Sequence, residues 1–183
     1  YFLSFGYYGE DGIWKTGDLN YHRYNIRSNL SFDVTKDLKA ELLIGAMSDE
    51  KNQPYKDTWE QFKAIWMLKP TETPYANNNE SFPNDVMYGL NPLMITDADQ
   101  SGYKRRINRT LNTTFTLTYK APFLKGLSAK FLYAYDYKNY QQKEFQKQYT
   151  LYKYDREKDV YNSQIYSSPS SIYRKSWEGA QNQ

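Results

Sequence analysis

Apolar and polar residues alternate along residues 106–119, and this pattern predicts a long strand. The apolar positions are Ile107, Leu111, Phe115, Leu117 and Tyr119, and the polar positions are Asn108, Thr110, Asn112, Thr114, Thr116 and Thr118. Because successive strand side chains point to opposite faces, the strand has one apolar face and one nearly uncharged polar face. Soluble strands usually have about 5–6 residues, whereas a tilted strand crossing a bilayer needs about 9–11. The length favours a membrane-spanning strand.

The same alternation predicts strands over residues 1–8, 21–34, 38–47 and 127–137, and the start of a sixth strand in residues 171–183. Short connections at residues 35–37 and 121–126 alternate with long ones at 9–20, 48–102 and 139–171. Outer-membrane barrels have short periplasmic turns and long extracellular loops. The predicted fold is therefore all-β: an antiparallel transmembrane β-barrel segment with long extracellular loops.

Two of the long connections contain further predicted elements. Residues from Asp57 onward predict a short helix, with Asp57 as N-cap and Glu60 completing a capping box. Trp59, Phe62 and Trp66 recur there at helical spacing. Residues 148–166 predict a small hairpin that turns near residues 155–159.

Composition narrows the possible functions. The chain has 183 residues, 39% of them hydrophobic, and a mean hydropathy of -0.91, and it lacks the long apolar run of a transmembrane helix. Twenty tyrosines raise the aromatic content to 18%, and such side chains favour interfaces.

The chain has no cysteine, and His22 is its only histidine, so disulfides and multi-histidine zinc sites are excluded. The net charge of +3, without a basic block, gives nucleic-acid binding no support.

The chain resembles the barrel of SusC/RagA-like TonB-dependent outer-membrane transporters. The resemblance runs in order through nearly the whole chain. It rests on YFLSFGYYGEDGIWKTGD, YHRYNIRSNLSFDVTKDLKAEL, LKPTETPYANN, NPLMITDADQSGY and TFTLTYKAPFLKGLSAKFLYAYDY.

The resemblance implies a 22-stranded barrel in the bacterial cell outer membrane, closed by an N-terminal plug. Such a barrel imports glycan or peptide nutrients with a SusD-like surface lipoprotein, and the TonB–ExbB–ExbD complex energises it through an N-terminal region. Residues 1–183 would be a partial TonB-dependent receptor barrel with about five strands and the start of a sixth, without the plug and the remaining barrel. It implies no cofactor. The partners would be outer-membrane lipid, the lipoprotein and the substrate, with no nucleic acid.

Trp14, Trp59 and Trp66 are candidate substrate-binding residues, because indole rings in loops can stack on sugars or contact a partner protein. The alternative is internal packing of the loops. For Trp59 and Trp66 the helical spacing favours packing, whereas for Trp14 the two possibilities are balanced.

A second set of candidates falls on the predicted lumen face, where it would contact the plug or a passing substrate. These residues are Arg23, Asn25, Arg27, Arg106, Asn108 and Asn112. Hydrogen bonds to the plug are the favoured role, since a filled lumen must satisfy its polar groups. Arg109 is the exception and falls on the lipid face, where it could snorkel or pair with lipid phosphate.

Two aromatic groups are predicted to mark the membrane rims. Tyr133, Tyr135 and Tyr137 would lie near the outer rim, and Phe32, Tyr119 and Phe123 near the inner one.

Asp97 and Asp99 resemble the start of a calcium loop, because carboxylates at alternate positions can converge on one ion. Asn108 stands where the closing glutamate should be, so an ordinary Asp/Gly turn is the favoured interpretation. No other metal site is predicted. The acidic residues form no recognisable hydrolytic pair, and no catalytic triad can be built around His22, so enzymatic activity is not expected.

Two alternative functions stay open. The chain could be a soluble, secreted β-rich module that binds carbohydrate through its tyrosines. It could also belong to another outer-membrane barrel, such as a porin or a membrane-embedded hydrolase. A plug domain encoded upstream would argue against both.

Overall fold

A single antiparallel sheet dominates the computed structural model, which describes residues 1–86, 89–124 and 126–182, with side chains described up to residue 176. The sheet has six strands in the order β1-β2-β3-β4-β5-β8 and is not closed into a barrel. Its strands are β1 (Phe2–Asp11), β2 (Asn20–Asp33), β3 (Leu38–Pro54), β4 (Gly102–Lys120), β5 (Ser128–Gln146) and β8 (Ser170–Asn182). The hairpin β6 (Tyr149–Asp155) and β7 (Val160–Tyr166) stands apart. The predicted antiparallel β fold and the small hairpin are confirmed.

Three of the strands extend at least four residues beyond the ends that the alternation predicted, and β1 extends three residues beyond, to Asp11. β3 continues to Pro54, β4 begins at Gly102 and β5 ends at Gln146. Most of the added residues are polar on both faces; Lys51 lies opposite Arg106 on the polar face, and Asn52 lies opposite Arg105 on the other face. Hydropathy therefore stops alternating there, although the backbone hydrogen bonds of the ladder continue. The predicted strand ends at residues 47, 106 and 137 are wrong for this reason.

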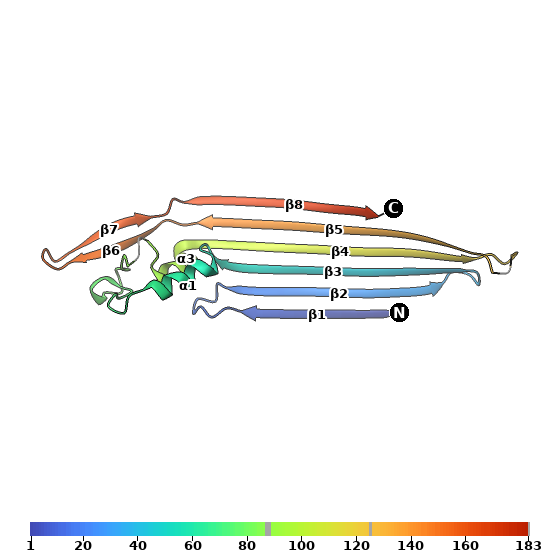
Figure 1. Cartoon of the computed structure of the whole chain (residues 1–183), viewed down its shortest axis with the longest axis horizontal. Helices are drawn as coiled ribbons and strands as arrows, with labels where there is room; N and C mark the ends of the chain where they lie inside the picture. Colours follow the sequence, from blue (N-terminus) through green and yellow to red (C-terminus); the bar gives the residue numbers. More distant parts are fainter. Residues whose placement is uncertain (87–88, 125, 183) are drawn as a thin grey trace.

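The long connections all lie at one end of the sheet, and the two short turns lie at the other (Figure 1). The short turn after β2 is closed by the backbone N–H of Val34, which donates to the Leu38 carbonyl at 2.8 Å. At the opposite end, residues 55–101 and 147–169 form what we call the loop cap. Its helical elements are α1 (Thr58–Met67), the 3-10 turn η1 (Ala76–Asn78), α2 (Pro92–Ile95) and α3 (Ala98–Ser101).

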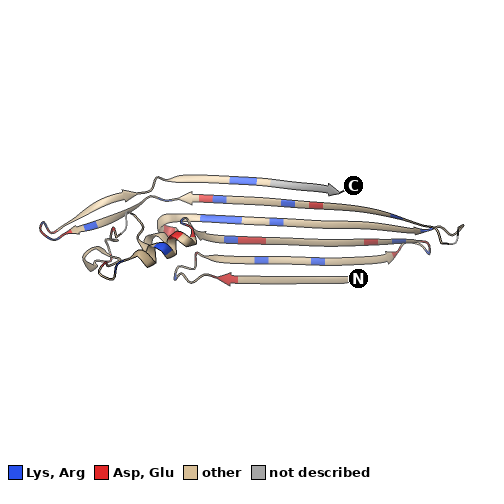
Figure 2. Cartoon of the chain, in the orientation of Figure 1, with Lys and Arg blue, Asp and Glu red and all other residues tan. Residues whose placement is uncertain are grey.

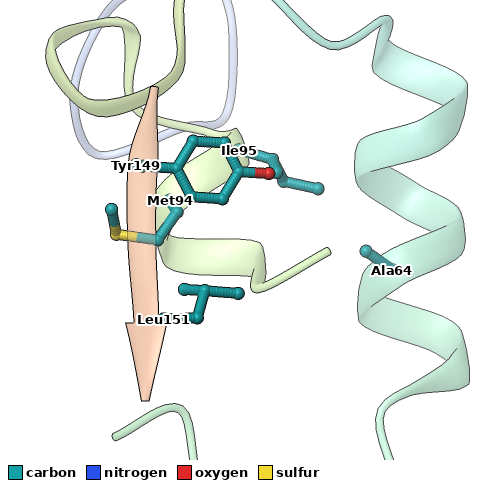
Figure 3. Packing of buried hydrophobic residues seen from close by; sticks show 5 residues of the cluster. All are labelled: Ala64, Met94, Ile95, Tyr149 and Leu151. Carbon is teal, nitrogen blue, oxygen red and sulfur yellow. The ribbon is translucent and has the colours of Figure 1, made fainter. Parts of the chain in front are cut away.

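The main hydrophobic cluster of the described residues lies in the loop cap and not on the sheet. Ala64 of α1, Met94 and Ile95 of α2, and Tyr149 and Leu151 of β6 pack together there (Figure 3). Ile95, Leu151 and Ala64 are fully buried. The Tyr149 hydroxyl also donates a hydrogen bond of 2.6 Å to the backbone carbonyl of residue 89. The loop cap is therefore a packed unit built from segments far apart in sequence.

Asn91 is a buried polar hub of this unit. Its side-chain Nδ2 donates to the carbonyl oxygens of Pro74 and Asn84, both at 2.8 Å. Its Oδ1 accepts from the backbone N–H of Leu93 at 2.9 Å, which caps the start of α2. Asn91 is fully buried, and these three bonds offset the cost of removing the amide from water.

Helix α1 starts with Asp57 at the N-cap, as predicted, but the predicted capping box is wrong. Asp57 makes no side-chain cap bond. Its Oδ1 accepts instead from Gln53 at 2.9 Å and from the ammonium of Lys104 at 3.2 Å, and Glu60 pairs with Lys56. Partial burial raises the pKa of the Asp57 carboxyl, but the hydrogen bond and charge of Lys104 outweigh it and leave the pKa below its usual value. A charge-assisted bond from a distant strand replaces the local cap.

Candidate functional site

The sheet has one apolar face, which the described residues leave largely uncovered. Leu117 of β4 lies opposite Ala40 of β3 and Phe131 of β5, so the apolar sets predicted for separate strands share this face. Phe5 and Phe131 are 69% and 59% exposed. We define the apolar face by Leu3, Phe5, Tyr7, Tyr24, Ile26, Leu30, Phe32, Leu38, Ala40, Leu42, Ile44, Ala46, Leu111, Phe115, Leu117, Tyr119, Phe131, Tyr133, Tyr135 and Tyr137.

The apolar face forms a band that covers nearly the same length of each neighbouring strand. On β3 it runs from Leu38 to Ala46 and on β4 from Leu111 to Tyr119, about nine residues on each strand and so about the span of a tilted transmembrane strand. On β4 no charged residue lies between Arg109 and Lys120 (Figure 2). Other charged residues lie at the same level along the strands as the band, for example Arg27 and Asp136. Their side chains belong to the opposite face of the sheet.

Aromatic residues mark the loop-side edge of the band differently from the prediction. Tyr7 and Tyr24 lie there on neighbouring strands with ring centroids 5.1 Å apart. Of the three tyrosines expected at the outer rim, Tyr137 lies opposite Leu111 at this edge, and Tyr133 lies opposite Phe115 in the middle of the band. Tyr133 lies farther from the loops because β5 extends beyond Tyr137 to Gln146. The membrane rim itself stays a prediction.

All six residues predicted for the lumen lie on the polar face of the sheet. The first row across the strands joins Arg23, Asp49, Asn108 and Tyr140 as successive register partners. Asn108 Nδ2 donates to Asp49 Oδ2 at 2.8 Å. The Asp49 carboxylate thus lies between a cationic residue and an amide.

A second row lies closer to the turns. Arg27, Gly45, Asn112 and Asp136 are successive partners, and Asn112 Nδ2 donates to Asp136 Oδ1 at 2.7 Å. Gly45 carries no side chain between Arg27 and Asn112, so the middle of this row is open.

The other two candidates differ in their surroundings. Asn25 lies between Gly6 and Met47. Arg106 lies between Lys51 and Gln142, and its Nε is buried without a hydrogen-bond partner among the described atoms. The structure therefore brings Asn108 and Asn112 into side-chain bonds with carboxylates, while an Nε of Arg106 stays unsatisfied.

A cavity of about 350 Å³ opens beside the first row. Its polar lining residues include Asp49, Asn108, Thr110, Lys138, Tyr140 and Ser176. A carboxylate, an amide, hydroxyls and an ammonium together can donate and accept hydrogen bonds to a polar neighbour. Sequence reasoning missed Asp49, Lys138 and Tyr140, because the predicted strands stopped at residues 47 and 137. Extending the strand pairing past the apolar band would have found them.

The tryptophans of α1 face outward. Trp59 and Trp66 are 69% and 77% exposed, whereas the buried residues of the helix are Gln61 and Ala64. The expected packing of these tryptophans inside the loops is therefore wrong. Helical spacing places residues on one face, but contacts with distant segments decide which face is covered. Their role as a stacking surface stays a prediction.

Trp14 is half-buried and packs against Phe62 of α1, with ring centroids 5.5 Å apart. Its indole Nε1 is buried without a hydrogen-bond partner among the described atoms. The contact joins the loop after β1 to the loop cap, so Trp14 has a packing role in this structure.

Asp97 and Asp99 do not converge on a common point. Asp97 Oδ1 accepts from the backbone N–H of Asp99 at 2.7 Å and caps α3. The Asp99 side chain is 97% exposed and lies 3.9 Å from the Lys147 ammonium. Gly102 ends the turn with a φ of 97°. This is the geometry of an Asp/Gly turn, and no group of three or more potential metal ligands occurs in the described part of the chain.

Tyr166 and Asp85 join the hairpin to the loop before α2. The Tyr166 hydroxyl donates to Asp85 Oδ2 at 2.7 Å. Burial, the hydrogen bond and the negative charge of Asp85 raise the pKa of Tyr166 to about 12. The neutral phenol therefore holds this contact through the physiological range.

No helix of the described residues is long and apolar enough to cross a membrane. A scan against models of protein families finds no match to this chain. A search of curated proteins finds none with significant sequence similarity.

Proposed function

We propose that this sheet is part of the wall of a bacterial outer-membrane β-barrel. The single observation that carries the proposal is the apolar band, which stays at the same level across neighbouring strands in register while most of its side chains are exposed or half-buried. Lipid would cover this face. In a soluble protein an exposed apolar area of this extent would favour aggregation or demand a partner.

Two further features support a barrel wall. The long connections gather at one end and the short turns at the other (Figure 1), as in outer-membrane barrels. The polar face carries paired amides and carboxylates, which suits a lumen. Since lipid does not tolerate unpaired backbone groups, further strands would have to cover the outer edges of β1 and β8.

Within that class, we propose a SusC/RagA-like TonB-dependent importer of glycan or peptide nutrients. The ordered sequence resemblance supports this choice, and the loop cap lies at the end of the sheet with the long connections. A plug would fill the lumen and contact the rows at Asn108 and Asn112. A SusD-like lipoprotein would sit on the loop end, and the TonB–ExbB–ExbD complex would supply the energy.

Site-directed spin labelling tests the wall proposal. Residues 111–117 are replaced one at a time by cysteine in the full-length protein and labelled in lipid bilayers; the chain itself contributes no competing thiol. Labels at 111, 115 and 117 should be relaxed by oxygen, which partitions into lipid, and labels at 112, 114 and 116 should not. Preferential relaxation of 111, 115 and 117 by a water-soluble nickel chelate would indicate a soluble module.

A second experiment separates an active importer from a porin. Cells that carry the intact gene are given fluorescent oligosaccharide and peptide mixtures, with and without a functional TonB protein. Uptake should cease without TonB. Unchanged uptake in its absence would identify an open porin instead.

A further inference from the structure

A shallow groove of about 330 Å³ lies at the loop-side edge of the apolar face. Its floor is open because Ala46 and Ser48 of β3 have small side chains. Tyr24 and Ile26 of β2 form one wall, and Arg109 of β4 closes the other. Tyr24, Ser48 and Arg109 are successive register partners on three neighbouring strands. The groove thus combines apolar walls with one cation.

Arg109 has no counter-charge in the described structure. It is exposed, and its guanidinium forms no ion pair or hydrogen bond with the described residues. Glu50, on the same face, is engaged by Arg105 at 2.8 Å and by Asn52 at 3.1 Å. A guanidinium presents a planar set of donors that matches a phosphate in two hydrogen bonds. Arg109 is therefore free to bind an anion at the edge of the band.

We propose that Arg109 and this groove bind an anionic phospholipid of the surrounding leaflet. The phosphate pairs with the guanidinium, and the adjoining acyl segment lies between Ile26 and Ala46. The site rests on the proposed membrane wall. A lipid fits better than a soluble anion, because a soluble anion would gain nothing from the apolar walls, and the volume is within the range of about 300–1,000 Å³ for small-ligand sites.

Lipid retention by the purified full-length protein tests this site. The protein is reconstituted with equal amounts of phosphatidic acid and phosphatidylcholine, re-extracted in detergent, and its bound lipids are counted by mass spectrometry. The wild type should prefer phosphatidic acid about fivefold, the factor expected for one cation beside an anionic lipid. Arg109→Gln should abolish the preference and Arg109→Lys should keep most of it.

Two matched variants distinguish the contribution of the Arg109 charge to lipid retention from the contribution of the groove. Ala46→Leu fills the floor and should lower the retention of phosphatidic acid, whereas Arg23→Gln removes the same charge from the opposite face and should leave the preference unchanged. An unaltered preference in Ala46→Leu would overturn the role of the groove. Equal lipid counts for wild type and Arg109→Gln would overturn the site but leave the membrane wall intact. A full-length protein that does not insert into the vesicles at all would overturn the membrane wall and the site together.

Discussion

Asn108 donates a hydrogen bond of 2.8 Å to the carboxylate of Asp49, and the two residues are direct partners between β4 and β3. Asn108 was expected on the polar face from its alternation with apolar neighbours. The partner residue Asp49 was not expected there, because it lies beyond the predicted end of β3 at residue 47. The pair forms the middle of the row beside the polar-face cavity.

Removing the amide should destabilise the full-length protein by about 1.5 kcal/mol, the usual size of a hydrogen bond to a charged group. We expect this loss for Asn108→Ala in a denaturant refolding titration. Thr110→Ala, on the same strand and face, is the control and should stay within about 0.5 kcal/mol. A double-mutant cycle with Asp49→Ala that yields no coupling energy would contradict the structural role of the bond.

Arginine substitutions on the two faces of β4 should differ strongly. Leu117→Arg should cost about 2–4 kcal/mol if the apolar band lies in a bilayer. Asn112→Arg should be far milder, since Asn112 is exposed on the polar face beside Asp136. Thr116 is a poorer control, because it is 4% exposed and an arginine would disturb its packing. Equal costs in a refolding titration would refute the face assignment.

Asn91→Ala should loosen the loop cap without unfolding the sheet. The substitution removes the three hydrogen bonds of a fully buried amide, at a cost of about 3 kcal/mol, while the carbonyls of Pro74 and Asn84 each keep one backbone donor. Faster hydrogen exchange should appear in residues 71–86 and not in β3 or β4. Asn162→Ala, at an exposed position of β7, should change neither region. Exchange that rises equally throughout the protein would show that the cap and sheet unfold together.

High pH should destabilise the loop cap through Tyr166. The pKa of Tyr166 is raised from an ordinary value of 10.0 to about 12, so the stability contributed by its neutral phenol is fully present below pH 10.0 and is lost as pH rises through about 12. We expect the protease resistance of the cap to fall over this window. Tyr166→Phe should be less resistant at neutral pH but lose less between pH 10.0 and about 12. Identical pH profiles for the two proteins would exclude this linkage.

The residual pH dependence in that variant has an expected source. Burial also raises the pKa of Tyr149, whose hydroxyl donates to the carbonyl of residue 89. The difference between wild type and Tyr166→Phe, and not the profile of either protein alone, therefore measures the contribution of the Tyr166–Asp85 contact.

The sequence predicted which residues share a face of each strand, but it did not predict where the strands end. The alternation around Leu117 predicted that this residue shares a face with Ala40 and Phe131. Alternation can be recognised wherever one face of a strand is apolar and the other is polar. At Lys51 and Asn52, which lie opposite Arg106 and Arg105, both faces are polar, and the alternation is lost while the strands continue. The same reason explains why the cavity-lining residues Asp49, Lys138 and Tyr140 were missed.

Helix α1 shows a second limit. The spacing of Trp59 and Trp66 places them on one side of the helix, but the apolar side is not the buried side here. Ala64 packs into the cluster because its small side chain allows close approach of α2 and β6. Which side of a helix is covered depends on segments that are distant in sequence.

From the sequence it was possible to predict where the apolar stretches of the strands lie and which of their residues share a face, because the alternation of side chains is a local property of an extended chain. Tertiary structure alone decided that Asn108 meets Asp49, that Arg109 closes a groove over Ala46, and that α1 turns its tryptophans outward. These relationships depend on the register of backbone hydrogen bonds and on packing between distant segments, and neither leaves a periodic trace in the local sequence.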